Sequence, residues 1–203
     1  MSRLFEGVSQ ESIPAELTDI AMALEALAEE GGGGEKLYVL LTDTNTRFSQ
    51  LAKKITKNPY NHASLSFDAD LENIYTYHLR GGEGTLRGGL KKESLDVLRG
   101  SRYSLYELSV TSDAYEKVMS KVKEMESSLE KTGYYHLGLI NAIFNKRIFE
   151  SEVGMRMFCS QFIVEVLKAA DIELFKNRHS STVRPYDFVK SKLLRFVRRG
   201  TFR

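Results

Sequence analysis

The sequence has little of several features that would define other classes of protein. Its 203 residues include one cysteine, Cys159. A single thiol forms no disulfide within the chain and supplies no thiolate cluster for structural zinc. No apolar run reaches the roughly 18 residues of a membrane span, and acidic residues stand where a secretory signal would be basic. We therefore expect a cytoplasmic protein with no membrane span, no metal site and no cofactor.

The chain also has almost no net charge. Its 29 Lys and Arg residues against 27 Asp and Glu residues give +2, which leaves no broad basic surface, so nucleic acid is not the expected partner. The charges are nevertheless divided, because residues 1–36 are acidic and the C-terminus is basic. The basic residues there are Lys190, Lys192, Arg195, Arg198, Arg199 and Arg203. This end is expected as a solvated tail, with an anionic partner as the alternative.

Length and local pattern divide the chain into three parts. Residues 14–30 have the apolar spacing of an amphipathic helix, and Gly31–Gly34 after them are expected to form a linker rather than a phosphate loop. We therefore expect an N-terminal appendage over 1–34, one catalytic domain over 35–190 and a basic tail over 191–203. A chain of 203 residues, 42% of them hydrophobic, can bury a core large enough for one such domain.

Within the central domain, strand and helix patterns are mixed. Residues 81–89 are rich in glycine and are expected as an irregular loop beside the site. Alternating or apolar runs predict strands at 36–42, 63–68, 73–79 and 104–110, the middle two paired as a hairpin. Helical spacing predicts helices at 46–56, 112–130 and 158–170. The expected fold class is α+β, an antiparallel sheet packed against helices.

Two residues carry the strongest chemical signal. Cys159 begins an apolar helical stretch, where the helix dipole and unpaired amide hydrogens favour a thiolate and hold a developing oxyanion. His62 leads a strand, and an imidazole near the thiol would accept its proton and return it to a leaving group. The alternative for Cys159 is a small buried core residue.

A resemblance covering about residues 36–190 favours the chemical interpretation. The chain resembles the circularly permuted NlpC/P60 (YiiX/YebB-like) papain-fold hydrolases, in which the histidine strand precedes the cysteine helix. The runs that carry it are 38–42, 60–66, 134–139, 158–162 and 185–188, and Phe-Cys-Ser-Gln-Phe at 158–162 is the most specific. The resemblance implies a permuted papain-like fold, a Cys159 nucleophile and a His62 base.

The remaining site residues follow less directly. In papain-like folds the group that orients the imidazole lies on the strand after the histidine strand, which favours His78 over Thr76, with Asp68 as a further candidate. His136 and His179 lack metal-ligand spacing and are expected to be structural or exposed. Residues expected to line the cleft or bind substrate are Tyr38, Asn61, Tyr134, Ser160 and Gln161.

Three functions are compatible with this pattern. A cysteine hydrolase acting on an amide or ester, with peptide or isopeptide amides favoured, is the first. An acyltransferase or thioesterase acting on acylated small molecules would use the same acyl-enzyme with another acceptor. A non-catalytic interaction protein would keep the scaffold, and a Cys159 distant from His62 would point to it.

Overall fold

The computed structural model describes residues 34–44, 58–80, 87–128, 132–134, 141, 146 and 155–203. Contacts gather Glu35–Arg203 into one compact unit. The helices expected at 14–30 and 46–56, most of the glycine-rich segments, His136 and the side chain of Tyr134 lie outside the described residues. No helix in the described parts of the chain is both long and apolar enough to span a bilayer.

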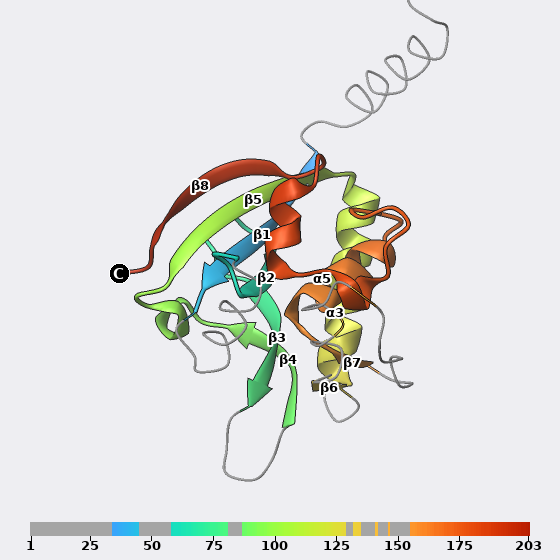
Figure 1. The fold of residues 1–203 in the computed structure, drawn as a ribbon. Coiled ribbons are helices and arrows are strands. Elements are labelled where there is room, and N and C mark those ends of the chain that lie inside the picture. Colours follow the sequence, from blue (N-terminus) through green and yellow to red (C-terminus); the bar gives the residue numbers. More distant parts are fainter. Residues whose placement is uncertain are drawn as a thin grey trace, which may run out of the picture. The chain divides into compact units, whose positions relative to one another are not determined.

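A six-stranded antiparallel sheet forms the centre of this unit, in the order β4-β3-β2-β1-β5-β8 (Figure 1). This confirms the predicted α+β class and the predicted β2–β3 hairpin. The strands are β1 Glu35–Asp43, β2 His62–Ser66, β3 Ile74–Arg80, β4 Arg87–Glu93, β5 Arg102–Val110 and β8 Arg195–Thr201. A separate pair of parallel strands is formed by β6 Thr132–Tyr134 and β7 Met155–Met157.

Strand alternation gives the sheet two apolar faces. On β1, Leu37, Val39 and Leu41 join a cluster that includes helical residues such as Val118 and Phe162. Tyr38 and Leu40 belong to a second cluster of buried residues. Because successive side chains point to opposite faces, the nearly continuous apolar run of β1 is that of a strand covered on both sides.

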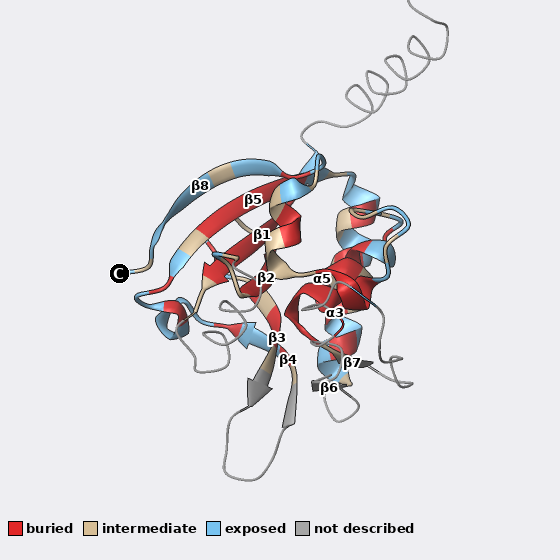
Figure 2. Ribbon diagram, viewed as in Figure 1, coloured by how far each residue is buried: buried red, intermediate tan, exposed pale blue. Residues whose placement is uncertain are grey.

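Two helices contribute to the first cluster. α3, Ser112–Ser127, begins after Thr111, whose hydroxyl accepts from the Ala114 amide. α5, Cys159–Lys168, packs on β2 and β3 and is buried over most of its length (Figure 2). Three short 3-10 helices complete the described elements: η1 Leu95–Leu98, η3 Ser180–Thr182 and η4 Pro185–Lys190.

Two strands differ from expectation. The segment 81–89 was expected as a loop, but its last residues begin β4, which pairs with β3 throughout. The basic C-terminal segment was expected as a solvated tail, whereas its residues 195–201 form the edge strand β8 against β5, exposed in pale blue in Figure 2. Edge strands tolerate glycine and charge because one side needs no partner, so neither sequence has the pattern of a buried strand.

Candidate active site

Cys159 is the first residue of α5 and is 5% exposed. Phe158 occupies the N-cap and provides no side-chain cap. The first hydrogen bond of the helix is donated by the Phe162 amide to the Phe158 carbonyl, so the amides of the preceding first turn have no acceptor within the helix. Cys159 therefore sits where the dipole and free amide donors favour negative charge.

His62 is the first residue of β2, and the Cys159 side chain lies near enough to its ring to help raise the pKa of His62. The structure thus brings together the two residues on which the catalytic interpretation depends. Both are buried, with His62 8% exposed.

Three oxygen atoms surround Nε2 of His62. They are Oε1 of Glu93 at 3.3 Å, Oγ of Ser64 at 3.3 Å and Oγ1 of Thr76 at 3.4 Å. Ser64 donates its own hydroxyl proton to Oε2 of Glu93 at 2.6 Å, and Thr76 donates to the Ala63 carbonyl at 2.9 Å. All three oxygens are therefore available to accept from His62, which favours a proton on Nε2.

Glu93, the last residue of β4, sets the charge of this site. Burial alone would lower the pKa of His62, but the Glu93 carboxylate and the neighbouring Cys159 sulfur outweigh it and raise that pKa to about 10. Burial would likewise raise the pKa of Glu93, yet the charge of His62 and hydrogen bonds from His62 and Ser64 hold it below its usual range. At neutral pH the pair is an imidazolium beside a carboxylate.

Sequence reasoning did not find Glu93. The orienting group was expected on the strand directly after the histidine strand, but Glu93 lies on the next strand, β4, for which no strand was predicted. The available signal was weak, because Glu93 follows Lys91 and Lys92 and resembles an ordinary solvated charge. In the structure the Glu93 side chain is buried, with 6% of it exposed. Charged side chains are seldom buried to this extent unless they are paired.

The three predicted orienting residues occupy different places. The His78 ring lies edge-on to that of His62, with centroids 6.1 Å apart, and its pKa is lowered by burial and then by the charge of His62. Thr76 contacts Nε2, as described above. Asp68 instead caps a turn, accepting from the amides of Glu72 and Asn73.

The predicted substrate-binding residues are also dispersed. Asn61 is used internally, accepting from the amide and hydroxyl of Thr44 and donating to the Thr44 carbonyl. Tyr38 packs in the second apolar cluster, away from α5. Gln161 is buried, and its Oε1 has no hydrogen-bond partner among the described residues.

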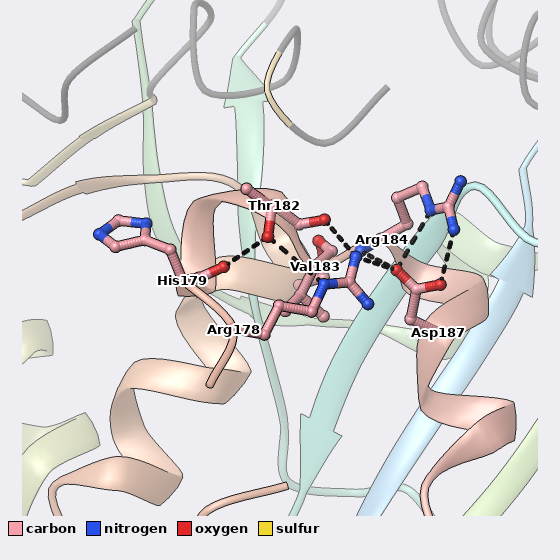
Figure 3. A network of polar contacts seen from close by, with 7 residues as sticks. Arg178, His179, Thr182, Val183, Arg184 and Asp187 are labelled. Carbon is pink, nitrogen blue, oxygen red and sulfur yellow. Dashed lines mark hydrogen bonds and ion pairs between the residues drawn. The ribbon is translucent and has the colours of Figure 1, made fainter. Parts of the chain in front are cut away.

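Ser160 ties the start of α5 to the segment that follows η3. Its hydroxyl donates to the Val183 carbonyl at 2.7 Å. Figure 3 shows how the neighbouring segment is held: Arg178 and Arg184 both pair with Asp187, at 2.7 and 2.9 Å. Burial opposes the charge of Asp187, but hydrogen bonds from the two arginines prevail and lower its pKa.

His179 lies in the same segment and is exposed, and its ring nitrogen accepts from the Ser181 amide. This agrees with the structural or exposed role expected for it.

Comparison with known proteins adds no identification. No protein-family model matches the chain, and no curated protein matches it significantly.

Proposed function

We propose that this protein is a papain-like cysteine hydrolase of the permuted NlpC/P60 type that cleaves an amide or ester, with a peptide or isopeptide amide favoured. The observation that carries the proposal is the grouping of three residues: the Cys159 side chain helps raise the pKa of His62, and Nε2 of His62 lies 3.3 Å from Oε1 of Glu93. Nucleophilic catalysis by cysteine requires a thiol, an imidazole beside it and a group that orients the imidazole. Cys159, His62 and Glu93 supply these three groups.

In the resting enzyme, His62 is an imidazolium and Cys159 supplies the thiolate. The sulfur attacks the substrate carbonyl carbon, and the first-turn amides of α5 donate to the oxyanion that forms. Collapse breaks the carbon–nitrogen bond, and Nδ1 of His62 gives its proton to the leaving amine. Water then loses a proton to the neutral imidazole and attacks the thioester, releasing the acid and regenerating thiolate and imidazolium.

Glu93 acts through His62 and is a positioning residue in this scheme. Its carboxylate fixes the ring through Nε2 and stabilises the imidazolium, which burial would otherwise disfavour. Ser64 in turn fixes the Glu93 carboxylate.

The presence of one cysteine makes the proposal directly testable, because all thiol alkylation by iodoacetamide takes place at Cys159. We expect the wild-type rate to remain high at about pH 6, since the imidazolium supports the thiolate. In His62→Ala the rate should follow an ordinary thiol, with a midpoint near about pH 8.5. Cys159→Ser is the blank.

A wild-type thiol that behaves as an ordinary one and is indifferent to His62 would refute the catalytic proposal. A second assay compares the rates at which the protein hydrolyses a library of peptide amides and a panel of acyl thioesters, again with Cys159→Ser as the blank. Preference for one set separates an amidase from a thioesterase or acyltransferase.

A further inference from the structure

An aromatic hollow lies on the part of the sheet formed by β5 and β8, beneath η4. It has a volume of about 550 Å³, within the range of small-molecule sites. The described residues that line it include the aromatic side chains of Tyr60, Tyr106, Tyr186 and Phe196. Phe196 is 48% exposed, so part of this aromatic lining is accessible from solvent.

Two of the segments that line the hollow lie next in the chain or in contact with those that carry His62 and Cys159. Tyr60 precedes His62 by two residues, which places their Cα atoms at most about 7 Å apart. Tyr186 follows Val183, whose carbonyl holds Ser160, the neighbour of Cys159. The Tyr60 and Tyr186 rings are stacked, with centroids 6.4 Å apart, so the two segments meet at this hollow.

Among the described residues that line the hollow, one is charged, and it is cationic. Arg199 of β8 is exposed, and its guanidinium forms no ion pair with any residue the structure describes. The other arginines of the strand differ: Arg195 is paired with Glu107 at 2.6 Å, and Arg198 donates to the Ala69 carbonyl. Lys190 lies close by, over the Tyr186 ring at 6.0 Å.

We propose that this hollow is the substrate subsite, and that it takes an amide whose flanking residue is aromatic or apolar and carries a free carboxylate. The aromatic walls accommodate the side chain, and Arg199 pairs with the carboxylate in the planar geometry that a guanidinium favours. This inference rests on the proposed function, because it requires a ligand in the hollow to reach Cys159.

Two thiol-directed probes test the subsite without a known substrate. N-chloroacetyl-phenylalanine has a free carboxylate, whereas N-chloroacetyl-phenylalaninamide is neutral, and both alkylate Cys159 through the same chloroacetyl group. Their rates are measured by intact-protein mass spectrometry. The acid-to-amide ratio cancels the reactivity of the thiol itself, which iodoacetamide measures separately, so failure of the subsite and failure of the catalytic proposal are distinguishable.

We expect the wild-type protein to react with the acid about two- to fivefold faster than with the amide, as an exposed ion pair allows. Arg199→Gln should bring the ratio to about one, and added salt should lower it. Arg198→Gln is the matched control, because it removes the adjacent arginine of the same strand and should leave the ratio unchanged. Tyr186→Ala should slow both probes without changing the iodoacetamide rate.

A wild-type ratio near one would overturn the proposal, and so would a ratio that survives Arg199→Gln. Loss of the preference in Arg198→Gln as well would assign it to the general basic character of β8 and would equally refute a specific subsite.

Discussion

The charge on His62 depends on one carboxylate. Burial opposes a charged imidazole, and Glu93 is the first of the groups that reverse this effect. An amide in the same place would still hold the ring but would not stabilise its charge. The residue at position 93 therefore decides whether the site contains an imidazolium or a neutral imidazole.

Glu93→Gln tests this dependence. The substitution keeps the shape of the side chain and removes its charge, while the burial of His62 remains. We expect the pKa of His62 to fall well below about 10, because burial still disfavours the charged ring and the largest opposing contribution is gone. Titration of the histidine ring signals by NMR, with His62→Ala to assign the signal, measures the change.

Two controls belong with this experiment. Glu107→Gln removes another buried carboxylate, which pairs with Lys36 and Arg195 rather than with His62, and should leave the titration unchanged. His78→Gln tests the orienting residue favoured by the sequence. Since a charge on His78 would oppose that on His62, its loss should not lower the pKa of His62. A fall with His78→Gln but not with Glu93→Gln would restore the sequence prediction.

At the scale of elements, sequence patterns predicted the interior better than the edges. β1, the β2–β3 hairpin, β5, α3 and α5 have apolar residues at strand or helix spacing, and all were expected close to their observed positions. β4 contains two glycines and two lysines in seven residues, and β8 contains three arginines. Whether these two segments form strands depends on pairing with a neighbouring strand, and the local sequence pattern carries no information about that neighbour.

The same limit applies to the candidate site. Cys159 and His62 could be predicted because each begins an element with a clear pattern and because their order matches a known arrangement. Glu93 could not be, because its role depends on the register of an edge strand and on contact across β3. The polar contacts of Asn61 could not be predicted either, since an amide beside a histidine looks the same whether it binds substrate or the Thr44 backbone.

Asp187 connects the elements that follow α5. It pairs with Arg178 and Arg184 and accepts from the Arg184 amide at 2.9 Å, so it holds η4 to the segment whose Val183 carbonyl receives Ser160. We expect Asp187→Asn to lower the free energy of unfolding by about 2 kcal/mol, less than for a fully buried pair because both arginines are about a quarter exposed. Urea unfolding measures this.

The matched control is Asp113→Asn, which removes an exposed carboxylate paired with Lys117 within α3 and should change stability by less than about 0.5 kcal/mol. Equal losses from the two substitutions would show that the Asp187 network does not hold the C-terminal elements in place.

For the whole molecule, the His62–Glu93 pair makes folding stability depend on pH in both directions. The folded-state pKa of His62 is above its unfolded value, so its contribution is complete below about pH 6.5 and is lost as the pH rises toward 10. The folded-state pKa of Glu93 is lowered, so its contribution is present above its ordinary value of 4.5 and is lost as the pH falls. Both contributions to the free energy of unfolding are therefore present together between about pH 4.5 and 6.5.

We therefore expect maximal stability between about pH 4.5 and 6.5, followed by a decline of up to about 1.4 kcal/mol per pH unit from His62 alone. Urea unfolding at intervals from about pH 4 to 9.5 measures the profile. The range stops below the folded-state pKa of His62, above which the free energy of unfolding no longer falls because of this residue. In the double variant His62→Gln/Glu93→Gln both charges are absent, so its profile reports the remaining ionisable groups. Subtracting it from the wild-type profile should leave the plateau and the alkaline decline. A difference that stays constant from pH 6.5 to 9.5 would mean that the folded protein does not hold His62 as an imidazolium, and the resting ion pair of the proposed mechanism would then be wrong.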